Sequence, residues 1–222
     1  MVRNRNLRLV MSLIINIIII VFEIIGTTIC AANTGFEMFS FYTTDSNIFA
    51  LTSCIVFSAF TLRSLFSKHK PEIPRRVKML KYISVCCLNV TFIVVVTIFA
   101  PVMGDDGYVQ MLFKDDFLYY HFACPLLSLI SFVLFEGGYE FDIGSSLAAM
   151  IPTMIYAVVA VLLNLLSVMN GPYPFLKVYS QPVYLSILWL LLIIGVSFLS
   201  ADIVAKLGRK FAPVKDKLLI TE

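Results

Sequence analysis

A short run of polar residues opens one of the long apolar segments of the chain. Residues 41–47 read Phe-Tyr-Thr-Thr-Asp-Ser-Asn, which brings hydroxyls, a carboxylate and an amide next to a stretch of apolar side chains. Hydrocarbon forms no hydrogen bonds with such groups, so within a membrane they need partners in the protein, in bound water or in a substrate. We therefore take this run as the first candidate for chemistry.

A histidine elsewhere in the chain supplies the group that a hydroxyl nucleophile requires. His121 lies in the first turns of another apolar segment, whereas the second histidine, His69, lies in a basic loop. The positive end of a helix dipole disfavours imidazolium, and neutral imidazole is the form that acts as a general base. Thr43 and His121 are therefore the predicted nucleophile and base for attack on an acyl carbon, with Thr44 and Ser46 as alternative nucleophiles.

Further polar side chains near the same end of the apolar segments could support this pair. A developing oxyanion needs hydrogen-bond donors, which amides, phenols and backbone N–H groups provide. The candidates for support or for an oxyanion hole are Asp45, Ser46, Asn47, Tyr120, Asn164 and Tyr173.

Each candidate also has a purely structural interpretation. Residues 43–47 are typical of a helix N-cap and first turn, where hydroxyls and a carboxylate satisfy free N–H groups. His121 stands beside two tyrosines and fits an aromatic belt at the membrane interface. Glu23, Asn89 and Asn164 are typical partners in hydrogen bonds between membrane helices.

The composition of the chain is that of an integral membrane protein. Its 222 residues are 59% hydrophobic and only 14% charged, and the mean hydropathy is +0.91. Such a chain is too apolar for a soluble domain of this size. We expect an all-α bundle that forms a single membrane domain over residues 1–222. The predicted spans are residues 7–32, 41–66, 79–103, 117–136, 145–169 and 181–207.

A stripe of small and polar side chains runs along the second predicted span at intervals of three and four residues. This spacing places the stripe on one helical face, which we expect to lie toward the interior of the bundle. Its members are Thr43, Ser46, Asn47, Ala50, Cys54, Ser58 and Thr61.

The basic residues predict the orientation. Six spans put both termini on one side, together with fifteen of the seventeen Lys and Arg residues, and only Lys114 and Lys177 fall on the other. The positive-inside rule then predicts that both termini are cytoplasmic. We interpret the basic residues between Lys68 and Lys81 as topological signals. Thr43 and His121 would accordingly lie near the non-cytoplasmic face.

Several classes of site are not indicated. Two histidines are too few for a multi-histidine metal or haem centre, and the sequence predicts neither a metal nor a cofactor. The basic residues fall in loops and tails, so we expect no nucleic-acid partner. All five cysteines lie in or beside apolar runs and are interpreted as packing residues. Cys30 and Cys124 are expected at similar depth, which would allow one disulfide.

Three stretches resemble one known family, in the same order and with similar spacing along nearly the whole chain. The first is Phe41-Tyr42-Thr43 at the start of a span. The second is His121, followed by Pro125 and an apolar run that ends in Glu136. The third is the sequence Tyr-Pro-Phe-Leu at 173–176, before the last span. Together they are similar to the androgen-induced and androgen-dependent multi-pass membrane proteins and their prokaryotic relatives.

The resemblance implies an activity. Characterised members of the family are six-span threonine hydrolases that cleave fatty acid esters of hydroxy fatty acids with one intramembrane threonine and one histidine. The threonine of the family's Phe-x-Thr motif falls on Thr43, and the histidine before the proline falls on His121. In animal members the histidine and the proline are one residue further apart than here. The continuation Asp45-Ser46-Asn47 is more similar to the prokaryotic branch.

The sequence therefore predicts a membrane-embedded hydrolase of ester lipids whose partners are the bilayer and an acyl ester substrate. In a prokaryote it would reside in the plasma membrane. The alternative is a lipid-binding or transport protein that uses the same polar pocket without catalysis. The oligomeric state and the identity of the lipid are not predicted.

Overall fold

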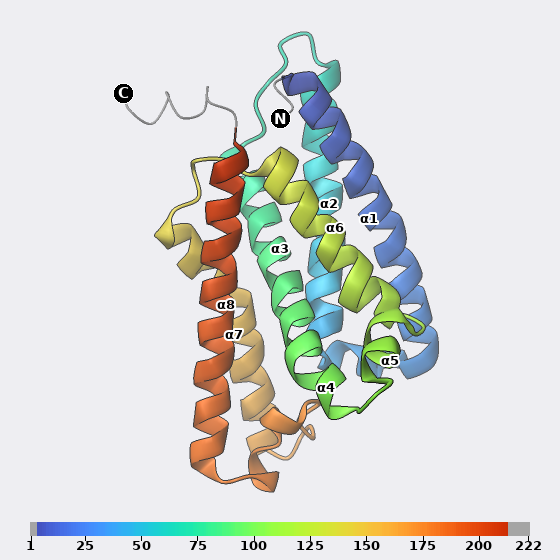
Figure 1. The fold of residues 1–222 in the computed structure, drawn as a ribbon, viewed down its shortest axis with the longest axis vertical. Coiled ribbons are helices and arrows are strands. Elements are labelled where there is room, and N and C mark those ends of the chain that lie inside the picture. The colour runs from blue at the N-terminus through green and yellow to red at the C-terminus, as the bar shows by residue number, and fades with distance from the viewer. Residues whose placement is uncertain (1–3, 213–222) are drawn as a thin grey trace.

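The computed structural model describes residues 4–212, and within that range the regular structure is helical with no strand (Figure 1). Six helical stretches are long and apolar enough to cross a membrane, which confirms the predicted all-α, six-span architecture. These stretches are Arg5–Ser40, Tyr42–Phe66, Arg75–Val102, Leu118–Glu136, Ile143–Leu165 and Val183–Phe211. Each predicted span overlaps one of them.

Local sequence sets several helix ends. Helix α1 (Arg5–Thr34) begins after Asn4, whose side chain accepts a hydrogen bond from the N–H of Asn6. It ends at Gly35, which has a φ of 57°, a value that favours glycine. Helix α7 (Ile143–Leu165) begins with a capping box in which Asp142 accepts from the N–H of Ser145. These signals position the spans within the bundle.

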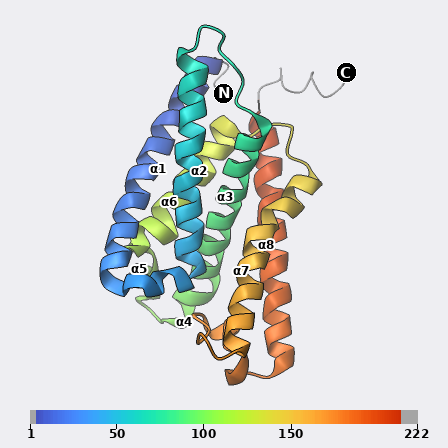
Figure 2. The same cartoon turned by 180° about the vertical axis from the view of Figure 1, so that it is seen from behind.

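The spans fall into two groups on either side of α3 (Arg75–Val94). Helices α1 and α2 (Tyr42–Phe66) and the fourth span, which contains α6 (Cys124–Ser131), pack together on one side. Helices α7 and α8 (Val183–Phe211) pair on the other side, as Figures 1 and 2 show from opposite directions. Helix α3 therefore packs against both groups of helices and separates the two halves of the bundle, which we call its two compartments.

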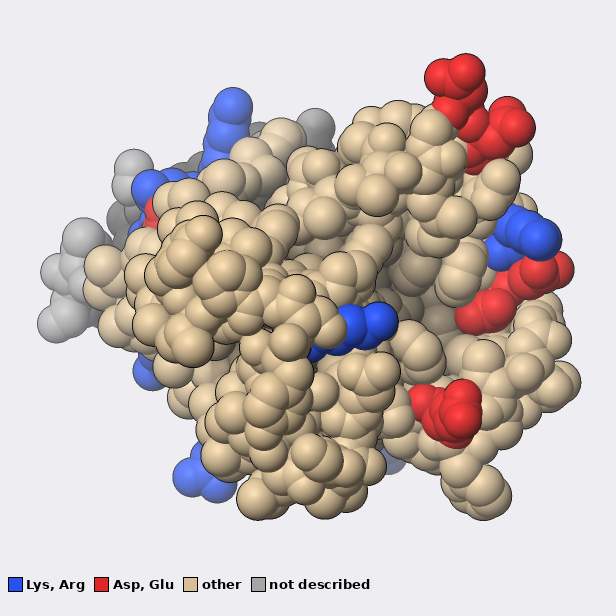
Figure 3. All heavy atoms as spheres, turned by 90° about the horizontal axis from the view of Figure 1, so that it is seen from below, with Lys and Arg blue, Asp and Glu red and all other residues tan. Residues whose placement is uncertain are grey.

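The two ends of the bundle differ. The start of α1 and the end of α8 lie together at what we call the terminal end. The short helices α4 (Ala100–Val102) and α5 (Gly107–Phe113) and the connection of residues 166–182 form the opposite, distal end. Viewed from there, the surface is mostly uncharged, with acidic side chains gathered along one side (Figure 3).

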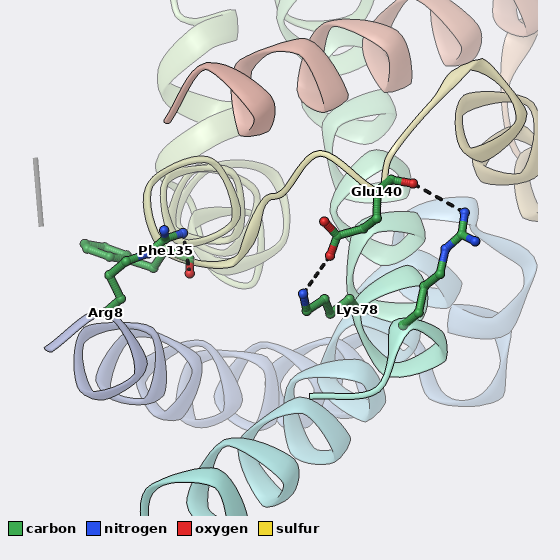
Figure 4. A network of polar contacts seen from close by, with 5 residues as sticks. Arg8, Lys78, Phe135 and Glu140 are labelled. Atoms are coloured by element: carbon green, nitrogen blue, oxygen red, sulfur yellow. Dashed lines mark hydrogen bonds and ion pairs between the residues drawn. The ribbon is translucent and has the colours of Figure 1, made fainter. Parts of the chain in front are cut away.

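Polar contacts join the elements at the terminal end (Figure 4). Arg8 donates to the carbonyl of Phe135 at 3.1 Å, and Lys78 forms an ion pair with Glu140 at 2.7 Å. Nearby, α8 meets the end of the fourth span without intervening side chains. A Cβ added to Gly137 would lie 2.6 Å from the Cα of Gly208, so only glycine allows this approach.

The fourth span is irregular at its distal start. Residues Leu118–Ala123 form a π-helical turn before α6. Pro125 lacks an N–H, so the carbonyl of His121 loses its usual helical partner, and the wider turn accommodates the proline. This turn carries Tyr120 and His121, and it determines how both side chains are presented.

Burial confirms most of the predicted stripe on α2. Ser46, Asn47, Ala50, Cys54, Ser58 and Thr61 are all buried, whereas Thr43 is half-buried. Two expectations were wrong. Lys81 does not belong to the basic loop, because it is 0% exposed inside the bundle. Cys30 and Cys124 form no disulfide, since both are free and buried.

Candidate functional site

A cavity of about 390 Å³ lies between α2, α3, α7, α8 and the connection that follows α7. Its walls are almost entirely aliphatic and aromatic, from residues such as Val94, Val161 and Trp189. The few polar groups are hydroxyls, those of Thr43, Thr91 and several tyrosines among them. The volume lies within the usual range for small-molecule pockets, and the lining suits an apolar chain with a weakly polar end.

Thr43 lines this cavity in the first turn of α2. Its Oγ1 lies 3.4 Å from the Oη of Tyr173, and its backbone N–H donates to the same Oη at 3.3 Å. The first N–H groups of a helix have no partner within the helix, so Tyr173 satisfies one that would otherwise be free. Burial raises the pKa of Tyr173 above its usual value. The phenol therefore stays protonated at neutral pH and acts as a hydrogen-bond donor, not as a base.

Aromatic packing holds Tyr173 in place. Its ring stacks on Phe175 with centroids 5.2 Å apart and meets Phe41 edge-on at 6.1 Å. Tyr156, which donates to the carbonyl of Ser40 at 2.7 Å, closes the same side of the cavity. The connection after α7 is thus fastened to the start of α2.

Ser46 and Asn47 support the backbone of Thr43 from behind. Ser46 Oγ donates to the carbonyl of Thr43 at 2.9 Å and lies 3.1 Å from Thr91 Oγ1. Asn47 Nδ2 donates to the carbonyl of Thr43 at 2.7 Å and to that of Tyr120 at 3.4 Å. Asn47 therefore joins α2 to the fourth span one residue before His121.

His121 is turned toward α5. Its Nδ1 lies 2.7 Å from the carbonyl of Met111, and its ring stacks on Phe117 with centroids 4.6 Å apart. Because a carbonyl can only accept, Nδ1 carries the hydrogen and Nε2 keeps the lone pair that a general base uses. The imidazole is buried but is not among the cavity residues. Thr43 and His121 are thus linked through Asn47 and the backbone, with no hydrogen bond between their side chains.

The remaining predicted residues are spread over different surroundings. Asp45 is exposed and lines a groove between α2 and α7. Tyr120 donates to Thr27 Oγ1 at 2.8 Å, toward α1. Asn164 donates to the carbonyl of Met169 and accepts from the N–H of Val178, each at 3.0 Å. Both of its polar groups are therefore engaged in the connection after α7, away from Thr43.

Sequence reasoning missed the contribution of α7 to the cavity. Thr153, Tyr156 and Ala157 all line it, and Thr153 Oγ1 lies 2.7 Å from the Oη of Tyr42. The signal was available, because these residues recur at intervals of three and four and so share one helical face. Within residues 4–212, no group of three His, Cys, Asp or Glu side chains is arranged to hold a metal ion.

Comparisons of the chain with protein-family models, with curated proteins and with solved structures give no match.

Proposed function

We propose that this protein is a membrane-embedded hydrolase of ester lipids, with Thr43 as the nucleophile. The observation that carries the proposal is the position of the Thr43 hydroxyl at the polar edge of an otherwise apolar cavity. An acyl chain in that cavity would bring its ester carbonyl next to Thr43. The resemblance to the androgen-induced family agrees with this choice of nucleophile.

In the proposed reaction, Thr43 Oγ1 attacks the ester carbonyl and its proton passes to a base. Tyr173 donates a hydrogen bond to the developing oxyanion, a role suited to a protonated phenol. Collapse of the intermediate releases the alcohol, which takes the proton, and leaves an acyl ester on Thr43. Water then cleaves that ester and regenerates the hydroxyl.

His121 is the proposed base, acting through Nε2. To reach Thr43, its ring has to turn away from Met111 and Phe117, which hold it by one hydrogen bond and one stacking contact. Catalytic hydrogen bonds are often unformed before substrate binds, so this arrangement is compatible with the role.

For the orientation, we propose that both termini are cytoplasmic and that the cavity lies toward the other face. The support is the distribution of charge along the sequence, since the basic residues that flank the predicted spans fall on the side of the termini, except for Lys114 and Lys177. The plasma membrane is the proposed location for a prokaryotic protein of this kind.

The test is hydrolysis of a fluorogenic long-chain acyl ester by the purified protein in detergent. We expect Thr43→Ala and His121→Ala to abolish turnover. Tyr173→Phe should lower kcat about tenfold, the effect of about 1.4 kcal/mol of lost oxyanion stabilisation. Thr52→Ala is the matched control, because Thr52 is an exposed threonine on the same helix. Folding of each variant is verified by its melting temperature.

A second function is favoured by one observation. The residues that line the cavity include no imidazole and no carboxylate, so the same cavity could bind a lipid without cleaving it. Wild-type protein that binds a fluorescent fatty acid but cleaves no member of a broad ester panel would establish lipid binding and refute the hydrolase.

A further inference from the structure

A second polar region lies in the other compartment, between α1, α2, α3 and the fourth span. We call it the polar column. The buried face of α1 defines it, with the polar residues Ser12, Asn16, Glu23 and Cys30 interrupted by Ile19 and Gly26. Ser12 and Cys30 are 18 positions apart, which corresponds to about 27 Å along a helix. The column is therefore nearly as long as the hydrocarbon core of a bilayer, about 30 Å.

Glu136 occupies the terminal end of the column. Its Oε1 accepts hydrogen bonds from Ser12 Oγ at 2.7 Å, from Asn16 Nδ2 at 2.6 Å and from Ser131 Oγ at 2.6 Å. Arg8 binds the neighbouring carbonyl of Phe135. Three donors converge on this one oxygen, so the carboxyl group of Glu136 is held in place at this end of the column.

Two charged side chains lie in the middle. Lys81 is 0% exposed, and its Nζ lies 2.9 Å from Cys54 Sγ. Cys54 packs with Cys124, and the thiol of Cys124 lies beside the carboxyl group of Glu23. Glu23 is also 0% exposed, and neither of its carboxyl oxygens has a nitrogen or oxygen partner among the described residues.

Glu136 has three side-chain donors, whereas Glu23 has no nitrogen or oxygen donor among the described residues. This difference determines the role of Glu23. An ionised carboxylate with no donor is costly in a buried, low-dielectric site, whereas a protonated carboxyl is not. The groups that face Glu23 are Cys54 of α2, Lys81 of α3, Cys124 of α6 and Tyr120 of the π-helical turn. Of these, only Lys81 favours the ionised form by its charge, and it lies beyond ion-pair distance of Glu23. Glu23 is therefore a buried carboxyl group that no N–H or O–H donor of the described residues holds in its ionised form, which makes it the candidate site for a mobile proton.

The column continues to the distal end. Thr27 lies one turn beyond Glu23 on α1 and accepts from Tyr120 Oη at 2.8 Å. Cys30 follows, and Asp116 lies next to it, 8% exposed, at the start of the fourth span. Burial raises the pKa of Asp116 above its usual value. A second carboxyl group that binds a proton more readily than usual thus stands at the distal end.

We propose that the polar column is a proton pathway through the membrane, with Glu23 as the carrier at its middle. A proton enters at the terminal end beside Glu136, binds the carboxylate of Glu23, and leaves past Thr27 and Tyr120 to Asp116. Each step moves one proton from a carboxylic acid or a hydronium ion to a carboxylate or water, and nothing is oxidised or reduced.

The test uses the full-length protein in liposomes that contain a trapped pH-sensitive dye. A potassium gradient with valinomycin sets the membrane potential, and the dye reports proton entry. We expect wild-type vesicles to acidify at least about tenfold faster than protein-free vesicles, and Glu23→Gln to remove the excess. Glu37→Gln is the matched control, since it makes the same change at an exposed site and should conduct like wild type.

Further variants separate the pathway from folding and from the hydrolase. Glu23→Asp keeps a carboxyl group and should retain a reduced flux. Infrared difference spectra between acid and neutral pH should contain a carboxylic acid band that Glu23→Gln lacks. Thr43→Ala should conduct like wild type even if it has lost ester hydrolysis. Wild-type flux equal to that of protein-free vesicles, or a flux unchanged by Glu23→Gln, would overturn the proposal.

Discussion

The cavity and the polar column lie on opposite sides of α3, and different residues of that helix belong to each. Lys81 contacts Cys54 in the column, whereas Val90 and Val94 line the cavity. The column contains buried charged residues, whereas the lining of the cavity has hydroxyls and no charged side chain. The two faces of one helix can thus separate buried charge from apolar volume in a membrane bundle.

The two regions also differ in how their polar groups are satisfied. In the column, Glu136 draws three side-chain donors from two spans. In the cavity, hydroxyls contact one another, Thr43 with Tyr173 and Tyr42 with Thr153, within a mostly apolar wall. Removal of one polar group from the column should therefore lower the stability of the protein. A substitution in the cavity should leave the stability nearly unchanged and weaken lipid binding.

The largest expected effect is on the column. Glu136→Ala would leave Ser12, Asn16 and Ser131 without their acceptor, at a cost of at least about 3 kcal/mol, since each unsatisfied buried donor costs about 1–3 kcal/mol. Thermal unfolding in a single detergent measures this loss. Glu140→Ala is the control, because the ion pair of Glu140 with Lys78 is partly exposed and worth about 0–1 kcal/mol. Equal melting temperatures for the two variants would contradict the contrast.

An intermediate effect is expected in the cavity. Ala157 lines it and is 7% exposed, so Ala157→Phe should fill part of the volume that an acyl chain would occupy. We expect the affinity for a fluorescent fatty acid to fall at least about tenfold, or about 1.4 kcal/mol. Fluorescence titration measures it.

The matched control is Val158→Phe, because Val158 is the next residue on α7 and is 52% exposed. It should bind the fatty acid as wild type does. If both variants bind equally well, the acyl chain does not occupy this cavity.

The smallest effect concerns the distal end of the column. The pKa of Asp116 is raised in the folded protein by burial, so its contribution to stability is full below the unfolded value of about 3.9 and is lost as pH rises through the folded value. Asp116→Asn should therefore melt at a higher temperature than wild type near pH 7 and at a similar one near pH 3. Asp115→Asn, at the exposed neighbouring position, should show no such pH-dependent gain. A constant difference at both pH values would rule out the protonation of Asp116 as the cause.

Much of the fold was predictable because the length of each apolar segment and the intervals between polar residues can be read directly from the local sequence. The six spans and the interior stripe of α2 follow from them directly. Lys81 was misplaced for a physical reason. It lies close in sequence to loop lysines, and only the packing of α2 against α3 shows that its long side chain reaches Cys54.

The candidate site was predictable only in part. The polar run at the start of a span indicated Thr43 as a candidate, but the direction of the His121 ring depends on α5. That short helix offers the carbonyl of Met111 as a partner, and nothing in the spacing of residues around His121 indicates it. The partner of Thr43 is likewise distant in sequence, since Tyr173 lies 130 residues away.

The contact between Gly137 and Gly208 has a mechanical consequence. It fixes α8 at the terminal end, whereas the cavity-lining residues of α8 lie in its first half, near the distal end. Helix α8 has 29 residues, so it is a lever roughly 43 Å long. The arm from Gly208 to the start of the helix at Val183 is roughly 38 Å, so a tilt of about 5° around the glycine contact would displace that end by roughly 3 Å. A small tilt would thus move the part of the cavity wall that α8 provides, while the glycine contact at the terminal end stays closed.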